Sequence, residues 1–192
     1  MNVARIAIFA SGSGTNAQSI IEYFRALATA KVTLLISNNP AARVLSRAAE
    51  FGVQTKVFTK AQFLETEEVL QVLTENSITH IVLAGFLLQI PPRLIQAFAK
   101  KIINIHPSLL PKFGGKGMYG LKVHEAVKAA NEKETGITIH EVNEHYDEGR
   151  IIFQAACEVL LTDSAERIAQ KVQRLEHQHF PAVIEQWIQS IN

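Results

Sequence analysis

Short runs of apolar, β-branched residues alternate along this chain with longer segments of helical periodicity. The apolar runs predict strands near Ile6–Phe9, Val32–Ser37, Gln54–Phe58, Ile81–Ala84 and Ile102–Ile105. The segments between them predict helices near Asn16–Leu27, Ala41–Phe51, Ala61–Glu75 and Pro92–Ala99. Strands that alternate with helices and are apolar throughout are typical of parallel sheets. The first half of the chain therefore predicts a doubly wound, mostly parallel α/β sheet.

The pattern changes after Gly120, where the chain predicts an antiparallel strand addition and a long C-terminal helix. The predicted elements are a helix at Val123–Ala130, two strands at Gly136–Val142 and Ile151–Val159, and the long helix at Ser164–His179. A shorter helix is predicted after Pro181. Asp163 or Ser164 is the expected N-cap of the long helix, because either side chain can accept a bond from a free N–H. Without repeats or a linker, residues 1–192 are predicted to form one domain.

The composition is that of a globular protein without a strong charge. The 192 residues are 47% hydrophobic, and 19 Lys and Arg residues against 18 Asp and Glu residues give a net charge of +1. Because nucleic acids and anionic membrane surfaces attract basic proteins, this balance disfavours both as partners and predicts small-molecule substrates. No sequence feature decides the oligomeric state, so a homodimer stays open.

The single cysteine and the N-terminus bear on location. Cys157 has no second cysteine to pair with, which excludes an internal disulfide and favours a reducing compartment. No apolar run approaches the roughly 20 residues that span a bilayer. Met1–Arg5 leads directly into the first predicted strand and lacks the organisation of a signal peptide. We therefore expect a cytoplasmic protein.

Asn104 and His106 mark the most distinctive segment of the chain. They close an apolar strand that Pro107 ends, and side chains two positions apart on a strand point to the same side. At the C-terminal end of a strand in an α/β sheet, that side can face the crevice where ligands bind. A carboxamide beside an imidazole that can become charged is suited to stabilise an oxyanion. For this motif alone, a histidine that merely caps a core strand stays an open alternative.

A glycine-rich loop, Ala10–Asn16, follows the first predicted strand. Its glycines allow a tight turn, and the helix after it presents free N–H groups and a positive dipole end to an anion. The loop lacks the ending of a Walker A motif and the third glycine of a dinucleotide fingerprint. No acidic residue ends the second strand at Ser37–Pro40, which disfavours a nicotinamide dinucleotide. The loop predicts a phosphate monoester site, and a simple turn with a helix cap is the alternative.

Asp147 stands in an acidic turn, His145-Tyr146-Asp147-Glu148-Gly149, after a strand that carries Thr138 and His140. Most acidic residues before a glycine are only turn residues. Its place in the chain, however, would let a carboxylate approach Asn104 and His106. Such a carboxylate would favour the imidazolium, so we expect it to raise the pKa of His106.

Together these segments resemble the formyltransferase family that uses 10-formyltetrahydrofolate, and within it the members that formylate glycinamide ribonucleotide in purine synthesis. The matching motifs are Ser-Gly-x-Gly-x-Asn at 11–16, Leu-Ala-Gly-Phe at 83–86, Asn104–Lys112, Gly136-x-Thr138-x-His140, Asp147-x-Gly149 and Gln173-x-x-Glu176-His177. They span nearly the whole chain in the family's order. The resemblance implies a Rossmann-like formyltransferase fold.

The resemblance also implies a role for each matching residue. Asn104 and His106 would hold the formyl oxygen, and Asp147 would support the charge and orient water for proton transfer. The ribonucleotide site would comprise Gly14, Thr15, Asn16, Gln173 and Glu176. The folate site would comprise Leu87, Leu88, Gln89, Ile90, Asn104, His140 and Asp147, with Lys60 as a weaker candidate. The co-substrate would be 10-formyltetrahydrofolate, and neither a metal nor a covalent nucleophile is required.

Two departures from the family pattern stand out. Leu88 occupies the position at which the family usually has an arginine in the folate pocket. The segment Phe113–Lys122 is longer and richer in glycine than usual, which suggests a mobile lid over the ribonucleotide. Lys116 or Lys122 could reach substrate from that segment, although a solvated lysine is the simpler interpretation for each.

The other histidines do not predict a metal site. His177 and His179 lie two apart on a predicted helix, so their side chains diverge. No carboxylate and histidine spacing in the chain matches that of a zinc helix. We therefore expect no catalytic metal.

Three alternatives to a ribonucleotide formyltransferase remain. A formyltetrahydrofolate hydrolase could use the same Asn, His and Asp set, but such proteins resemble this chain less at the glycine loop and carry a further N-terminal domain. Initiator-tRNA formylation is disfavoured by the absence of a basic C-terminal domain before Asn192 and by the net charge. A non-catalytic nucleotide- or folate-binding module would keep the glycine loop without needing Asp147.

Overall fold

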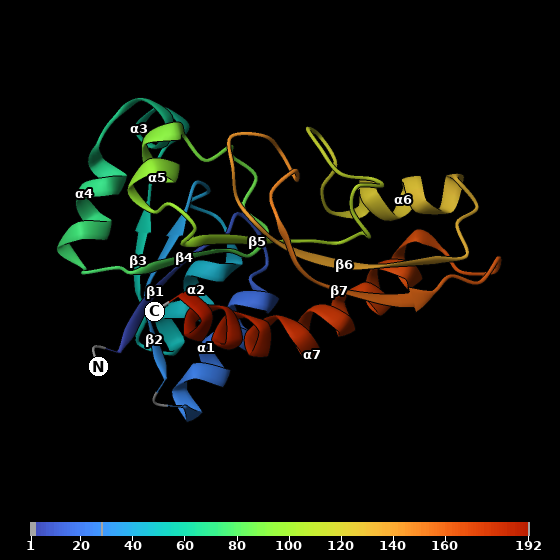
Figure 1. Cartoon of the computed structure of the whole chain (residues 1–192), viewed down its shortest axis with the longest axis horizontal. Coiled ribbons are helices and arrows are strands. Elements are labelled where there is room, and N and C mark those ends of the chain that lie inside the picture. Colours follow the sequence, from blue (N-terminus) through green and yellow to red (C-terminus); the bar gives the residue numbers. More distant parts are fainter. Residues whose placement is uncertain (1–2, 28, 192) are drawn as a thin grey trace.

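In a computed structural model that describes residues 3–27 and 29–191, the chain forms a seven-stranded mixed sheet with helices on both faces (Figure 1). The expectation for Met1 and Asn2 lies outside the described residues. The strands are β1 Ala4–Phe9, β2 Ala30–Ser37, β3 Gln54–Val57, β4 His80–Leu83, β5 Ile102–His106, β6 Glu134–Glu141 and β7 Ile151–Glu158. The helices are α1 Thr15–Ala26, α2 Arg43–Glu50, α3 Lys60–Glu65, α4 Glu68–Glu75, α5 Pro92–Ala97, α6 Leu121–Ala129 and α7 Ala165–Ile191.

The sheet confirms the predicted doubly wound architecture. Its strand order is β3-β2-β1-β4-β5-β6-β7. The first five strands are parallel, while β6 runs antiparallel to β5 and β7 runs antiparallel to β6. The strand order reverses between β1 and β4, which places a crevice beyond the C-terminal ends of these two strands. Open α/β sheets bind ligands at such a point.

Alternation along β1 shows why both faces of the sheet are covered. Ile6 and Ile8 face one apolar cluster, which they share with residues of α1 and α7, whereas Ala7 and Phe9 face a second cluster with residues of α3, α4 and α5. All four side chains are fully buried. Successive strand residues point to opposite faces, so a strand that is apolar at every position requires helices on both sides (Figure 1).

The single helix predicted over 61–75 is wrong, because the chain divides there into α3 and α4. Arg93, from α5, donates hydrogen bonds to the carbonyl oxygens of Phe63, Leu64 and Thr66 at 2.7, 2.8 and 2.5 Å. A helix that continued would use these carbonyls for its own backbone bonds. Because the Arg93 side chain binds the carbonyl oxygens at the C-terminal end of α3, the helix ends there.

The two helices predicted at the C-terminus are one continuous helix, α7, with Pro181 inside it. Proline removes one backbone hydrogen bond from a helix and usually ends or kinks it. Here Phe180, Pro181, Val183 and Ile184 are all buried against the sheet, and this packing holds the helix together across the proline. Ser164 is the N-cap of α7, since its hydroxyl accepts a bond from the backbone N–H of Arg167 at 3.2 Å.

Candidate active site

A cavity of about 820 Å³ opens at the C-terminal ends of β1, β4 and β5. Its walls come from the glycine loop before α1, the segments after β4 and β6, the chain between β5 and α6, and the middle of α7. The cavity therefore lies at the reversal point of the strand order, where the fold predicts a ligand site. Every predicted site residue except Lys60 lines it, as does Lys116, whereas Lys122 does not. Lys60 begins α3 as an exposed residue and is not brought to this cavity.

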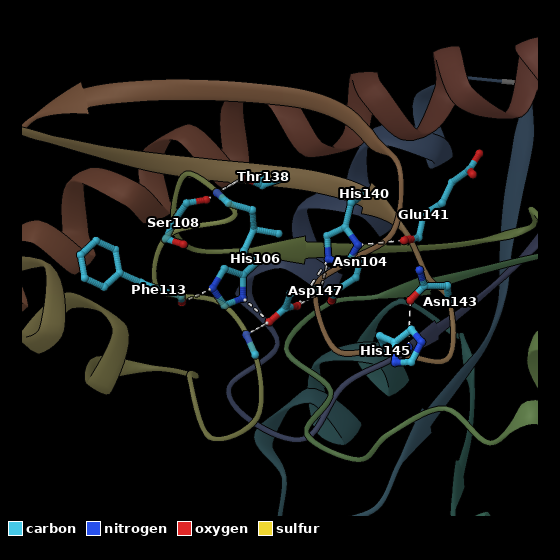
Figure 2. A network of polar contacts seen from close by, with 12 residues as sticks. Asn104, His106, Ser108, Phe113, Thr138, His140, Glu141, Asn143, His145 and Asp147 are labelled. Atoms are coloured by element: carbon cyan, nitrogen blue, oxygen red, sulfur yellow. Dashed lines mark hydrogen bonds and ion pairs between the residues drawn. The ribbon is translucent and has the colours of Figure 1, made fainter.

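One end of the cavity holds a polar cluster of Asn104, His106, His140 and Asp147 (Figure 2). The pairing of β5 with β6 sets Asn104 opposite His140 and His106 opposite Thr138. Because directly opposite residues on neighbouring strands lie on the same face, the antiparallel junction brings three of the four members together. Asp147 follows β6 and adopts a left-handed backbone with φ of 59°, a conformation that Asp tolerates better than most residues.

The Asp147 carboxylate lies at the centre of the polar cluster. Its Oδ1 is 3.5 Å from both the Asn104 amide nitrogen and His140 Nε2. Its Oδ2 is 3.5 Å from His106 Nδ1 and accepts a 2.8 Å hydrogen bond from the backbone N–H of Gly115. Only 11% of the Asp147 side chain is exposed, so the Asn104 amide and the Gly115 N–H replace water as donors to the charge.

The groups around the Asp147 carboxylate lower its pKa. Burial alone would raise it, but the neighbouring His140 and His106 rings and the N–H of Gly115 outweigh burial. The carboxylate is therefore ionised at neutral pH and available to support positive charge beside it.

His106 lies between two acceptors. Its Nε2–H donates to the carbonyl oxygen of Phe113 at 2.8 Å, and its Nδ1 faces Asp147 (Figure 2). The pKa of His106 is nevertheless lowered, because burial outweighs the opposing effects of Asp147 and the Phe113 carbonyl. The sequence expectation of a raised pKa is thus wrong in its net direction, although the contribution of Asp147 has the expected sign. For a largely buried imidazole, the free energy of charging without full hydration is larger than the favourable interaction with one carboxylate at 3.5 Å.

His140 is oriented by its neighbours on both sides. Its Nδ1–H donates to the backbone carbonyl of Glu141 at 2.8 Å, which leaves Nε2 to accept from the Asn104 amide at 3.1 Å. This bond fixes which way the Asn104 amide points, since its nitrogen is held toward His140 and Asp147.

Buried hydrogen bonds beneath the polar cluster hold the turn after β5. The Thr138 hydroxyl donates to the carbonyl oxygen of Ser108 at 2.7 Å and accepts from the backbone N–H of Leu110 and the side chain of Gln154 at 3.0 and 2.8 Å. Ser108 donates to the carbonyl oxygen of Lys112 at 2.7 Å. Sequence reasoning missed these contacts, as well as those of Phe113 and Gly115, because backbone groups leave no residue-type signal.

The other end of the cavity, which we term the glycine-loop end, comprises Gly12–Asn16 with Gln173 and Glu176 of α7. Gly14 is the N-cap of α1 with φ of 77°, and no side chain caps the helix. The first N–H groups of α1 are therefore left to a ligand or to water. Gln173 donates to the Thr15 hydroxyl at 3.1 Å, and Asn16 donates to Glu176 at 2.8 Å. Burial raises the pKa of Glu176, partly opposed by the bond from Asn16.

The segment Leu87–Ile90 forms a third part of the wall. The backbone N–H of Leu87 donates to the Ser11 hydroxyl at 3.0 Å, and the Gln89 amide donates to the carbonyl oxygen of Glu144 at 2.9 Å. Leu88 packs on the apolar cluster that includes Phe63. This wall thus presents backbone groups and apolar surface.

The segment Gly114–Gly120 contributes Gly115–Gly120 to the cavity wall. Lys116 is the one Lys or Arg among the cavity-lining residues in the described part of the chain. The same segment supplies the Gly115 N–H that binds Asp147. The cavity therefore has a single fixed cation, and it lies on the glycine-rich segment.

The described residues, 3–27 and 29–191, contain neither a metal-binding group nor a membrane-spanning helix. Within them, no three or more His, Cys, Asp or Glu side chains are grouped so that they could hold a metal ion. In the same ranges, no helix combines the length and the apolar character that crossing a membrane requires.

Comparison with known proteins gives consistent matches. A model of the formyl transferase family matches residues 4–184. The chain is 40% identical over 186 residues to the chloroplastic phosphoribosylglycinamide formyltransferase of Arabidopsis thaliana, covering 94% of this chain and 64% of that protein. It is 38% identical to the phosphoribosylglycinamide formyltransferase of Bacillus subtilis, covering 95% and 93%. The chain thus spans less than two thirds of the plant relative and nearly all of the bacterial one.

Solved structures agree with these matches. The crystal structure of phosphoribosylglycinamide formyltransferase from Bacillus halodurans superposes with a TM-score of 0.86 at 39% identity, covering 95% of this chain and 94% of that one. The corresponding enzyme from Anaplasma phagocytophilum gives a TM-score of 0.88 at 35% identity, covering 96% and 86%.

Proposed function

The chain belongs to the formyl transferase family, and from this premise we propose that it transfers the formyl group of 10-formyltetrahydrofolate to the amine of glycinamide ribonucleotide in purine biosynthesis. The names of its relatives supply the acceptor. Residues 1–192 would act as one catalytic domain.

One observation carries the proposal. An amide, an imidazole and an ionised carboxylate converge at one end of a cavity whose other end is an uncapped helix N-terminus. Groups that can stabilise a developing negative charge thus share one cavity with a site suited to a phosphate. This arrangement fits a reaction in which an amine on a phosphorylated acceptor attacks a carbonyl carbon.

The polar cluster would serve the chemical step. The acceptor amine attacks the formyl carbon, a C–N bond forms, and the formyl oxygen becomes an oxyanion that Asn104 and protonated His106 stabilise. The bond to the folate nitrogen then breaks, and that nitrogen takes up the proton that the amine loses, carried by water that Asp147 orients. The 3.5 Å contacts of Asp147 with Asn104 and His106 support this role, because catalytic hydrogen bonds are often long in the free protein and tighten when substrate binds.

The lowered pKa of His106 is compatible with such a role. Burial keeps the imidazole neutral in the free protein at neutral pH. An oxyanion that forms beside it favours the charged ring, which raises its proton affinity when the intermediate appears. The proton would then be held at Nδ1, since Nε2–H stays with the Phe113 carbonyl.

The glycine-loop end would bind the ribonucleotide. The N–H groups of Gly14, Thr15 and Asn16 would hold the phosphate, and Glu176 and Gln173 would hold the ribose and the loop. The bonds from Gln173 to Thr15 and from Asn16 to Glu176 support this, because they tie the loop to α7 in one rigid wall.

The folate would occupy the wall formed by Leu87, Leu88, Gln89 and Ile90, next to His140 and Asp147. With Leu88 packed on the core, the pterin would bind through backbone groups and apolar contact instead of through an arginine. Lys60 has no part in this assignment, because it does not line the cavity.

The test is the absorbance of the folate on mixing purified protein with 10-formyltetrahydrofolate, with and without glycinamide ribonucleotide. We expect turnover only when the ribonucleotide is present. Equal turnover without it would identify a hydrolase, and no turnover under either condition would contradict a catalytic function with this acceptor.

A further inference from the structure

His124, on α6, is a buried titratable group to which the proposed reaction assigns no role. Only 5% of the residue is exposed, and it lines the cavity. No hydrogen-bond partner lies within reach of its Nδ1 among the described residues, and that atom is closed off from solvent. Buried polar groups in native proteins are nearly always paired, so an imidazole in this state at a cavity wall needs an explanation.

His80 provides a matched contrast. It is also buried, and burial lowers its pKa to about 4, as burial and the charge of His106 do for His124. His80, however, pairs through Nδ1 with the Thr79 hydroxyl at 2.8 Å and packs against Trp187, away from the cavity-lining residues. Nε2 of His80, like Nδ1 of His124, is buried without a hydrogen-bond partner, so what sets His124 apart is that it lines the cavity.

The geometry of the ring selects the atom that can meet a ligand. Since Nδ1 is closed off, contact falls to Nε2. A buried N–H without an acceptor is rarer than a buried acceptor without a donor, which places the proton on Nε2. We propose that His124 is a further substrate-contacting residue, whose Nε2–H donates a hydrogen bond to an uncharged oxygen of the acceptor, a carbonyl or hydroxyl between its phosphate and its amine.

The position of His124 favours an uncharged oxygen over the phosphate. It lies in the first turn of α6, shortly after Gly115, whose N–H binds Asp147 of the polar cluster. The phosphate has its own donors in the free N–H groups of α1. Because its pKa is about 4, His124 is a neutral donor at physiological pH and supplies no charge to neutralise a phosphate.

The experiment removes and then restores the donor. His124→Leu should raise the KM for glycinamide ribonucleotide about three- to tenfold, the value of one hydrogen bond, and leave the KM for 10-formyltetrahydrofolate unchanged. His124→Gln places an amide near Nε2 and should recover most of the affinity, whereas His124→Asn places it near Nδ1 and should not. Glu125→Ala, exposed on the same helix, is the control and should behave as wild type.

The dephosphorylated acceptor shows whether His124 contacts a phosphate oxygen or a carbonyl or hydroxyl oxygen. If His124 contacts a carbonyl or hydroxyl, His124→Leu should weaken binding of glycinamide riboside by the same factor as it weakens binding of the ribonucleotide. An effect that vanishes with the riboside would assign His124 to the phosphate and overturn the proposal. So would equal changes in both KM values, or a lowered melting temperature with unchanged KM values, since these indicate a purely structural residue.

This inference rests on the proposed function, and its failure can be told apart from the failure of that function. Wild-type protein that does not consume formyl donor in the presence of the ribonucleotide contradicts the proposed function. Active wild-type protein whose His124 variants match it in both KM values contradicts only the role of His124.

Discussion

The polar cluster and the glycine-loop end of the same cavity are built in opposite ways. At the polar cluster, Asp147 already has donors on both carboxylate oxygens, and His106 has acceptors facing both ring nitrogens. At the glycine-loop end, the start of α1 has no side-chain cap. If the cavity acts as proposed, the groups that would act on a developing charge are positioned before substrate arrives, while the groups that would bind the phosphate are left free for it.

The largest expected effect comes from neutralising the centre of the polar cluster. Asp147→Asn should lower kcat at least about 10²-fold, because the support for the His106 charge and for proton transfer is lost. Binding of both substrates should persist, as measured by calorimetry. Glu148→Gln, exposed in the same loop, should leave kcat unchanged. An Asp147→Asn variant with normal turnover would remove Asp147 from the mechanism.

On acidification, the stability that depends on neutral His124 should be lost at a higher pH than the stability that depends on ionised Asp147. The unfolded chain takes up a proton at His124 near the ordinary value of 6.5, whereas the folded chain does so only at about 4, so stability falls between these values as pH falls. The loss at His124 should reach about 3 kcal/mol by pH 4. Asp147, whose folded pKa is lowered, contributes stability that is kept above its ordinary pKa of 3.8 and is lost only below it.

Denaturant unfolding at pH 7 and pH 4 measures this difference. The free energy of unfolding of His124→Gln should depend less on pH than that of the wild type over this interval. An identical pH dependence in the two proteins would show that His124 does not titrate as its burial implies.

A backbone change should damage the glycine-loop end without touching the polar cluster. Gly14 has a left-handed φ, and an added Cβ would overlap the Val44 side chain of α2, so Gly14→Ala should lower the free energy of unfolding by about 1–3 kcal/mol. It should also raise the KM for the ribonucleotide. Gly12→Ala is the control, because a Cβ at Gly12 meets open space. Equal stability of the two variants, measured by thermal unfolding, would contradict this account of the loop.

The smallest effect concerns the one fixed cation on the cavity wall. Lys116→Ala should raise the KM for the ribonucleotide by up to about fivefold, since an exposed charge pair contributes less than about 1 kcal/mol. The effect should shrink at high salt. Lys122→Ala, outside the cavity wall, should show no such dependence. A salt-independent change at Lys116 would indicate a packing role.

The alternation of residue types predicted the sheet and the meeting of Asn104 with His106, because strand periodicity decides which side chains share a face. The antiparallel addition also sets His140 opposite Asn104, and the expected approach of Asp147 to Asn104 and His106 is confirmed. The break between α3 and α4 could not be predicted, since it depends on Arg93, which is distant in the sequence. Continuity through Pro181 likewise depends on tertiary packing.

Within the site, side-chain motifs were predictable and backbone contacts were not. The Phe113 carbonyl and the Gly115 N–H meet His106 and Asp147 only through the path of a glycine-rich segment, which residue types do not specify. The direction of the His106 pKa was missed for a related reason. A neighbouring carboxylate can be inferred from a motif, but the extent of burial that opposes it depends on the whole fold.

The segment that bears Lys116 also supplies the Gly115 N–H to Asp147, and it follows directly on the Phe113 carbonyl that holds His106. Under the proposed function, a residue that would contact the acceptor and the groups that hold His106 and Asp147 therefore lie in the same short segment. An engineer who reshapes this segment to admit a different amine would alter the protonation geometry of His106 with the same edit. New acceptor specificity should be sought first in the walls that do not hold the proposed catalytic groups, such as the middle of α7.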